Sequence, residues 1–577
     1  MANLLSMVDL RNKPSREGFD LGLTHSFTTK VGELLPVCVR EVFPGDKFKL
    51  NTDSFVRTQP CQTSAFVKLR EYYDVIFVPL VQLWRFAPDV LAQADNLSFA
   101  KSPSTALVPS TEFPHFSVTA LKGYCNGAGD SNVDKFGYSD KYKIARLFQM
   151  FRYGNSDYLT LSNSGAGYNH APDERCIFRF AAYQKAYNDW FRFEQWQKPE
   201  PWTWNFDYLT DSTVIPNINA GNAGMFTLRR ANWEKDYFLG LLPEAQFGAE
   251  AGVDVEFIND VSGANHTDLS AADLLTKDDQ FTFINNKGAS FPSGSGAQSQ
   301  GFSMAFSSRD TPTKLRANLP IIALRQAQFL QKWKEIKQSG KPNYQDQIEK
   351  VFGVKPSSSY SGLSKYLYGW SNDISISEVM NTNLGESNSA IIKGKGIGSG
   401  NSQTEEFDFN EHGILLVLHH IKPQLQYQNI GADIATTRID VEDWPNPVFD
   451  KIGMQPVNFF EMISSGSTQT SATSPNYMGY APRYVDLKTS YDIVSGDFLK
   501  SSKDWVAPLT EEWLAKVINS DLSKGILNAD VFRIDPSVLD SIFGVNAGNS
   551  VESDQFKVRT KITFGAVRNF DKNGLPY

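Results

Sequence analysis

Three histidines, His412, His419 and His420, lie close together in the C-terminal half of the chain, beside several acids. If residues 407–421 form a strand, His412 and His420 lie on one face, roughly 26 Å apart. That separation is too large for both imidazoles to bind one ion, so a metal site would need ligands from elsewhere in the chain. We therefore predict packed or interface histidines at these positions rather than a metal centre.

A glycine-rich run, KGKGIGSG at residues 393–400, is superficially similar to a phosphate-binding loop. It lacks the G-x-x-x-x-G-K-[ST] spacing, and NSQTEEFDF follows it instead of a helix. Phosphate binding of this kind depends on the free N–H groups at a helix N-terminus. We predict a flexible or tightly turned loop here.

Two clusters of carboxylates could in principle supply the acid pair of a glycosidase. Such a pair must be held about 5–10 Å apart around a sugar. Acids are common in turns, so we predict that both clusters are solvated. Their members are Glu405, Glu406, Asp408 and Glu411 in the first cluster and Asp440, Glu442 and Asp443 in the second.

The remaining chemical signals are negative. The chain has no G-x-S-x-G elbow and no H-E-x-x-H pair. Its four cysteines contain no C-x-x-C pair and are predicted to be isolated thiols: Cys38, Cys61, Cys125 and Cys176. We predict no catalytic, cofactor-binding or metal-binding residues, and hence no enzyme.

Composition restricts the class of protein further. The chain has 577 residues, 56 Lys and Arg against 64 Asp and Glu, and a net charge of −8. This balance disfavours a free-standing basic nucleic-acid binder, and 41% hydrophobic residues are ample for a large core. Aromatic residues reach 13%, and 41 Gly with 28 Pro favour many turns.

Targeting signals are not recognisable. The first twenty residues lack a basic region and a long apolar stretch, so we predict no secretory signal. The most apolar later runs, at 75–84 and 414–418, are far shorter than the roughly 18 residues that span a bilayer. We expect the protein to stay in the cytoplasm in which it is made, or to leave it without a signal.

The elements that must position these residues are strands at both ends of the chain. Strands are predicted at 34–43 and 47–50 around a turn at 44–46, at 72–78, and later at 407–427, 477–488 and 555–566. Length alone suggests roughly four domains. Strands separated by such long stretches instead favour one β-core with insertions.

Helices are predicted between the strands, at 181–197, 321–338, 344–352 and 511–518, the last with Thr510 as N-cap. The aromatic face of the first helix is assigned to core packing. Residues 96–140 are predicted to form one long connection. Residues 245–312, rich in Gly, Ser, Asn and Asp, are either a disordered linker or an exposed functional loop. No fixed repeat is visible.

Several aromatic-rich segments follow one another in an order and spacing that is specific for one family. They are VFPGDKFKL (42–50), YYDVIFVPLVQLW (72–84), FAAYQKAYNDWFRFEQWQ (180–197), RRANWEKDYFLGLLPEAQFG (229–248), NLPIIALRQAQFLQKWKE (318–335), YQDQIEKVFGV (344–354), FNEHGILLVLHHIKPQLQY (409–427) and NYMGYAPRYVDLKTSYDIVSGDF (476–498). Together they resemble the major capsid protein of the Microviridae, in the gokushovirus-like branch. Residues 245–312 and the short, non-basic N-terminal arm depart from that pattern.

The resemblance implies a mainly β fold, an eight-stranded viral jelly roll with long, partly helical inter-strand insertions. The whole chain, 1–577, would then be a single jelly-roll capsid domain. Residues 245–312 would form a surface insertion, a candidate protrusion at the three-fold axes that serves in host attachment.

The resemblance also implies partners and a place in the cell. It implies sixty copies in a T=1 shell built of pentameric units, assembled in the cytoplasm of a bacterial host around a circular single-stranded DNA genome. Because each copy carries −8, we expect a small basic internal DNA-binding protein to neutralise the packaged DNA. A minor or pilot protein and a host cell-surface receptor complete the expected partners.

Two other classes of protein remain open at this point. An exported glycan-binding or glycan-degrading protein of a gut bacterium would use aromatics as sugar platforms, but the missing signal argues against it. A fibre or spike adhesin usually shows internal repeats, and none is visible. In the capsid reading, part of the aromatic excess is inter-subunit surface, since obligate interfaces favour aromatic residues.

Overall fold

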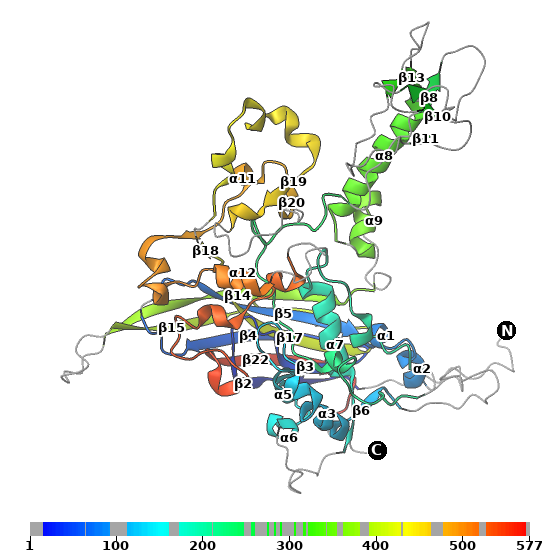
Figure 1. Cartoon of the computed structure of the whole chain (residues 1–577). Coiled ribbons are helices and arrows are strands. Elements are labelled where there is room, and N and C mark those ends of the chain that lie inside the picture. Colours follow the sequence, from blue (N-terminus) through cyan, green and yellow to red (C-terminus); the bar gives the residue numbers. More distant parts are fainter. Residues whose placement is uncertain are drawn as a thin grey trace, which may run out of the picture. The chain divides into compact units, whose positions relative to one another are not determined.

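Figure 1 shows a computed structural model of the chain. The structure describes residues 15–63, 65–92, 112–160, 172–209, 212–246, 321–341, 343–354, 362–380, 392–428, 431–462, 477–517 and 527–572, together with the backbone of the short strands β8–β13 between residues 256 and 318. Within this part of the chain, no helix combines the length and the apolar character needed to cross a bilayer.

The chain divides into two compact units. One contains Met1–Ala245, Lys341–Glu349 and Gly353–Tyr577, and the other contains Gln246–Gly340 and Lys350–Phe352. The second unit includes α8 (Ile321–Gln338) and the paired short strands β8 (Glu256–Asn259) with β13 (Leu315–Asn318), β9 (Leu274–Leu275) with β12 (Ala305–Phe306), and β10 (Thr282–Phe283) with β11 (Ala289–Ser290).

The first unit is built on a ten-stranded antiparallel sheet that comprises two arrays. The BIDG array, named after the strand letters of viral jelly rolls, runs β1 (Glu17–Asp20) and β2 (Leu23–Thr29), β22 (Phe556–Arg568), β4 (Lys47–Thr58), then β15 (Ile392–Asn401) and β16 (Glu405–Asp408). The CHEF array runs β3 (Leu35–Val42), β17 (Gly413–Pro423), β5 (Leu69–Pro79) and β14 (Lys365–Met380).

The connectivity of these arrays is that of a jelly roll. Successive strands β2, β3, β4 and β5 alternate between the arrays, and β14 pairs with β15 where the two arrays join. Counting the interrupted strands β1/β2 and β15/β16 once each leaves eight strands. The predicted mainly β, eight-stranded jelly roll is therefore confirmed, and the long strands lie side by side in Figure 1.

Two long insertions account for most of the remaining chain. The first, between β5 and β14, contains β6 (His115–Ser117), β7 (Glu174–Cys176), α1 (Leu80–Leu83), α2 (Ala87–Ala92), α3 (Val118–Cys125), α4 (Ala128–Ser131), α5 (Asp140–Met150), α6 (Ser156–Thr160), α7 (Phe178–Ala186), η1 (Tyr187–Phe191), η2 (Pro201–Thr203), η3 (Ala223–Phe226), the second unit and α9 (Tyr344–Phe352).

The second insertion lies between β17 and β22. It contains β18 (Tyr427–Gln428), β19 (Met454–Asn458), β20 (Tyr477–Pro482), β21 (Ile493–Val494), α11 (Val485–Lys488), α12 (Glu511–Val517) and the short turns η5 (Ile434–Thr437), η6 (Val441–Asp443), η7 (Pro447–Ile452), η8 (Phe459–Glu461), η10 (Gly496–Leu499), η11 (Lys503–Trp505), η13 (Ala529–Phe532), η14 (Pro536–Leu539) and η15 (Val551–Ser553). The expected partly helical insertions are thus present.

The two arrays differ in how they are covered. Phenylalanines pack between them, with the ring of Phe48 4.9 Å from that of Phe564 and the ring of Phe77 4.8 Å from that of Phe409. Strands β17 and β5 are buried on both faces, because α7 and its neighbours cover their other side. Strands β4 and β22 instead alternate between buried and exposed residues, so the BIDG array keeps one open face.

The helix predictions were confirmed where periodicity was strong. Helices α8 and α9 have the predicted bounds, α9 ends at the left-handed Gly353 (φ 71°), and Thr510 caps α12 through the Trp513 N–H at 3.3 Å. The helix predicted at 181–197 begins at Phe178, widens into the π-turn η1 and stops at Phe191. Its aromatic face packs in the core as predicted.

Two segment predictions were wrong. Residues 112–140, predicted as part of one connection, contain β6, α3 and α4. Serines that are also typical of loops act here as helix caps, Ser117 for α3 and Ser139 for α5. Ser117 accepts a hydrogen bond from the Ala120 N–H, and Ser139 from the Tyr142 N–H. The strand predicted at 477–488 ends at Pro482 and is followed by α11.

Candidate functional site

One side of the BIDG array is exposed, and we call it the open sheet face. Alternation along β4 and β22 places every second side chain there. Its members are Lys47, Lys49, Asn51, Asp53, Phe55 and Arg57 on β4, and Lys557, Arg559, Lys561, Thr563, Gly565 and Val567 on β22.

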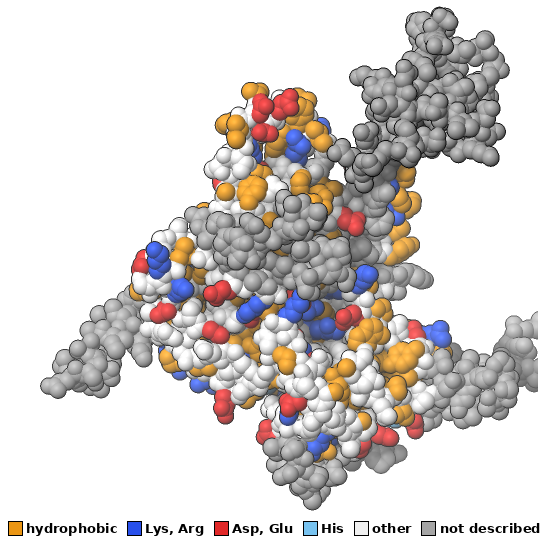
Figure 2. All heavy atoms as spheres, viewed as in Figure 1, with side chains coloured by type: hydrophobic (Ala, Val, Ile, Leu, Met, Phe, Trp, Pro, Cys, Tyr) orange, Lys and Arg blue, Asp and Glu red, His pale blue; other side chains and the backbone are white. Residues whose placement is uncertain are grey.

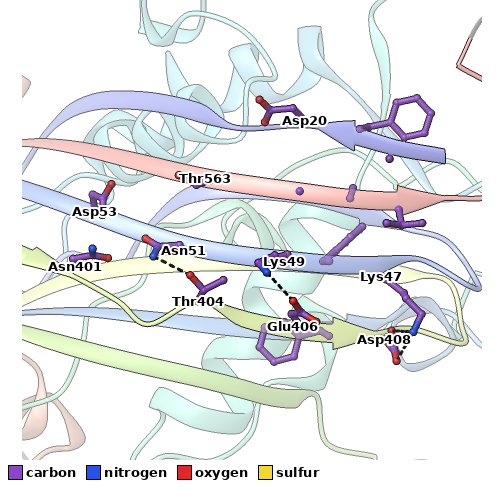
Figure 3. A pocket seen from close by; sticks show the side chains of 17 residues that line it. Asp20, Lys47, Lys49, Asn51, Asp53, Asn401, Thr404, Glu406, Asp408 and Thr563 are labelled. Carbon is purple, nitrogen blue, oxygen red and sulfur yellow. Dashed lines mark hydrogen bonds and ion pairs between the residues drawn. The ribbon is translucent and has the colours of Figure 1, made fainter.

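One half of this face is hollowed into a trough of about 800 Å³, lined by β1, β4, β16, β22 and residues 401–404. Figure 3 shows its polar side chains gathered along β4 and the strand beside it. The hollow exists because Thr563 and Gly565 on the central strand β22 are short, while neighbouring side chains are long.

The two lysines in the trough are paired with carboxylates across strands. Lys47 lies 3.0 Å from Asp408, and Lys49 lies 2.9 Å from Glu406. The Asn51 amide donates a hydrogen bond of 3.3 Å to the Thr404 hydroxyl. The dashed lines of Figure 3 mark these three contacts. Asp20 and Asp53 also line the trough, so acids outnumber lysines in it.

The other half of the open sheet face is different, because its cations form no ion pair with a carboxylate in the part of the chain that the structure describes. Arg57, Lys557 and Arg559 belong to it, as does Lys561. Sequence reasoning missed this surface. The alternation of Lys and Arg in KVRTK (557–561) was a visible signal, but its pairing with a strand about five hundred residues away was not.

The three histidines do not form a site together. His412 precedes β17 and packs its ring against Phe43 at 6.0 Å. His419 is fully buried between the arrays, 3.1 Å from the Glu71 carboxylate. His420 points to the opposite face of β17 and stacks on Tyr72 at 5.0 Å. The prediction of packed histidines is confirmed for His419 and His420.

Burial controls the protonation of the groups around His420. Burial, Lys422 and His419 together hold the pKa of His420 well below its usual range. Burial raises the pKa of Asp74, which lies 3.5 Å from His420 and accepts a hydrogen bond from the Tyr366 hydroxyl. Both shifts disfavour the charged forms, so burial weakens an ion pair between His420 and Asp74.

The glycine-rich run at 393–400 was predicted to be a loop, and that prediction was wrong. The run lies within strand β15. Its alternate glycines face inward, where a Cβ would collide with neighbouring atoms. A Cβ on Gly396 would lie 2.4 Å from Thr58 Cγ2, and one on Gly400 would lie 2.7 Å from the Trp370 ring. The glycines therefore permit close approach of packed strands, and the run is not followed by the helix N-terminus that a phosphate-binding loop requires.

The carboxylate clusters are solvated, as predicted. Glu406 and Asp408 form the surface ion pairs described above, and Glu411 lies 3.3 Å from Lys365. Asp440 and Asp443 form a capping box around η6. Among the residues that the structure describes, no group of three or more His, Cys, Asp or Glu is arranged to hold a metal ion.

The cysteines are isolated thiols, as predicted. Cys38, Cys61 and Cys125 are buried, and burial raises the pKa of each, to about 12 for Cys125. A protonated, buried thiol is a poor nucleophile, so these side chains serve as small apolar core residues.

Large apolar side chains are exposed in both units. On α8, Ile322 and Phe329 are 70% and 69% exposed. In the segment 431–462, Ile439 is 91% exposed and Trp444 is exposed as well. Figure 2 shows hydrophobic side chains on the face of the molecule that it draws. Exposed apolar surface of this extent is typical of proteins that bind other protein surfaces.

Comparison with known proteins identifies the family. A family model described as "Capsid protein (F protein)" matches residues 8–151 and 155–529. Capsid protein VP1 of Chlamydia phage 1 is 23% identical over 84% of both chains, and that of Bdellovibrio phage phiMH2K is 23% identical over 84% of this chain and 82% of the relative. Capsid protein VP1 of Spiroplasma virus 4 is 26% identical over 59% of this chain and 64% of its own.

The family-model match covers strands β1 to β17 and most of both insertions, and ends before β22. These matches confirm the resemblance to the Microviridae major capsid protein and the prediction of a structural protein of the virion rather than an enzyme. The chain belongs to the capsid protein (F protein) family of phages.

Proposed function

We propose that this protein assembles as sixty copies into a T=1 icosahedral shell that encloses a circular single-stranded DNA genome. The observation that carries the proposal is an eight-stranded jelly roll in one continuous antiparallel sheet, with most of the remaining chain in two insertions. Such a block keeps its core unchanged while its loops meet neighbouring copies. Contacts that close into rings would build the pentameric units and the other rotational axes.

Exposed apolar side chains support self-assembly. They occur on α8 and on the segment 431–462, which belong to different units of the chain. Obligate interfaces between subunits are apolar and favour aromatic residues. A chain that contributes to several kinds of contact would carry such surfaces in more than one place.

The test is expression of the full chain, followed by electron microscopy and mass measurement of the product. Uniform isometric particles with sixty times the mass of one chain support the proposal. Dispersed monomers stabilised by sugars would overturn it in favour of an exported glycan-binding protein.

We further propose that residues 245–312 form a surface insertion that serves host attachment, as a protrusion at the three-fold axes. Most of this segment falls within the separate unit Gln246–Gly340, which supports a module outside the jelly-roll core. The partners of such a shell would be packaged single-stranded DNA, a small basic internal DNA-binding protein, a minor or pilot protein and a host cell-surface receptor.

The strand pairing in this unit suggests a clean deletion. Because β8 pairs with β13 and Asn259 lies opposite Leu315, residues 260–314 can be replaced by a short Gly-Ser turn. We expect shells to form but phage adsorption to be lost. A variant that does not assemble would show instead that the insertion is a structural part of the shell.

A further inference from the structure

The unpaired cations of the open sheet face form a compact group that we call the basic strip. It consists of Arg57 on β4 and Lys557, Arg559 and Lys561 on β22, with Phe55 between them. In the antiparallel register, Lys557 lies opposite Arg57, Arg559 opposite Phe55, and Lys561 opposite Asp53. These side chains therefore share one face and lie in consecutive cross-strand rows.

The cations of the basic strip lack ion-pair partners among the described residues. Each of its four cations is exposed, and none forms an ion pair or hydrogen bond with any residue that the structure describes. Lys47 and Lys49, farther along the same face of β4, are paired with Asp408 and Glu406. Like charges placed directly opposite each other, as in Lys557 and Arg57, are unfavourable unless an anion lies between them.

An aromatic ring lies within this group of cations. Phe55 is 37% exposed, and the Arg57 guanidinium lies over its ring at 5.0 Å from the centroid. Ile397, opposite Arg57 on β15, is 45% exposed and extends the apolar patch. A flat apolar surface bordered by cations can bind a molecule that combines planar rings with negative charges.

The spacing of the cations selects an extended polyanion. Alternate residues on a strand are about 6.7 Å apart, so Lys557, Arg559 and Lys561 form a straight row of charges at that interval. This interval is close to the distance between successive phosphates of an extended single strand. Proteins bind single-stranded nucleic acid without sequence preference by stacking its bases on aromatic rings and holding its phosphates in a basic groove.

We propose that the basic strip binds a segment of single-stranded DNA, with phosphates on Arg57, Lys557, Arg559 and Lys561 and a base stacked on Phe55. This inference rests on the proposed function and implies that the open sheet face is turned towards the packaged genome. It also explains how a chain with a net charge of −8 contacts DNA, since four of its cations are concentrated on one face, where their three cross-strand rows contain one acid, Asp53.

The first test uses filled wild-type particles and requires no substitution. Ultraviolet irradiation of particles grown with bromodeoxyuridine should attach nucleotides to the peptide of residues 51–57, and above all to Phe55. Nucleotide adducts found only on peptides outside β4 and β22 would overturn the inference. Failure of the wild-type chain to form closed particles would instead overturn the proposed function.

The second test measures binding of a fluorescent oligo-dT by purified full-length subunits as a function of salt. The variant Lys557→Gln/Arg559→Gln/Lys561→Gln loses three phosphate contacts, so the slope of log K against log salt should fall by about 2. The matched control Lys332→Gln/Lys451→Gln/Lys500→Gln has the same change in charge on exposed lysines elsewhere and should retain the wild-type slope. A thermal unfolding curve establishes that each variant is folded.

Two results would contradict the inference. One is an unchanged salt slope in the strip variant. The other is a strip variant that binds oligo-dT as tightly as wild type but no longer assembles, which would assign the open sheet face to a contact with a second copy of the chain.

Discussion

At the scale of single residues, His420 makes the stability of the core depend on pH. The unfolded chain protonates this histidine below about pH 6.5, whereas in the folded chain burial, Lys422 and His419 keep its pKa well below that value. Above pH 6.5 the neutral His420 therefore makes its full contribution to the free energy of unfolding. As the pH falls below 6.5 this contribution is lost, by at most about 1.4 kcal/mol per pH unit.

We expect His420→Phe to reduce this decline in thermal unfolding curves recorded between pH 5 and 7.5. A phenyl ring keeps the stack on Tyr72 and the edge contact with Phe191 but takes up no proton. Asp74, the carboxyl that faces His420, has a raised pKa and acts with the opposite sign at lower pH. An unchanged pH profile in the variant would show that His420 does not control it.

The inward glycines of β15 give a second prediction for single residues. Gly396→Ala would place a methyl group 2.4 Å from Thr58 Cγ2, and overpacking of this kind costs about 1–3 kcal/mol. Chemical denaturation measures the loss. Gly18→Ala, on the open strand β1 with nothing within 4 Å of the new methyl group, is the matched control and should leave stability nearly unchanged.

At the scale of elements, a buried network of charges joins three segments that are far apart in sequence. Asp554, just before β22, lies 2.7 Å from Lys30 at the end of β2 and 2.8 Å from Arg146 on α5. Glu33 accepts a hydrogen bond from Tyr142, and although burial opposes it, Arg146 and Lys30 lower the pKa of Glu33. The network holds α5 against strands β2 and β22 of the BIDG array.

We expect Asp554→Asn to destabilise the fold by about 3–5 kcal/mol, because it leaves two buried cations without their shared carboxylate. Denaturant unfolding measures the change. Asp408→Asn removes a comparable ion pair at the surface, where both partners are more than half exposed, and should cost about 0–1 kcal/mol. Equal losses of unfolding free energy in the two variants would mean that burial does not determine how much each ion pair contributes to stability.

The accuracy of the sequence predictions also differs between elements. Helices α8 and α9 were predicted with their observed bounds, because strong periodicity and the stop signals Gly340, Pro342 and Gly353 are local. Strand β15 was missed because its glycines are explained only by neighbours on β4 and β14. Helices α3 and α4 were missed because their capping and small residues are also typical of loops.

At the scale of the whole molecule, the arrangement of charge matters more than its sum. The net charge of −8 led to the prediction that a separate basic protein neutralises the packaged DNA. Pairing of residues 47–58 with residues 556–568 concentrates four cations on one face. No property of either segment alone predicts that patch, since register between distant strands is set by the fold.

The aromatic excess is also a property of the whole chain and leads to a last prediction. Much of it fills the cores, but Phe329, Trp333 and Trp444 are exposed in the isolated chain. If these surfaces are buried between copies, dissociated subunits should bind a hydrophobic dye and aggregate, while intact particles should not. Dye fluorescence measured before and after mild dissociation provides the test, with sedimentation to follow aggregation.

The same experiment can distinguish the dye binding of one unit of the chain from that of the other. Replacing residues 260–314 by a short turn retains α8 and the segment 431–462, so dissociated subunits of that variant should still bind dye. Substituting Phe329→Ser and Trp333→Ser in the full chain should lower dye binding without unfolding the jelly roll, since α8 lies outside the two arrays. Soluble, dye-silent wild-type subunits would instead mean that the exposed aromatics are not covered by assembly, and the 13% aromatic content would need another explanation.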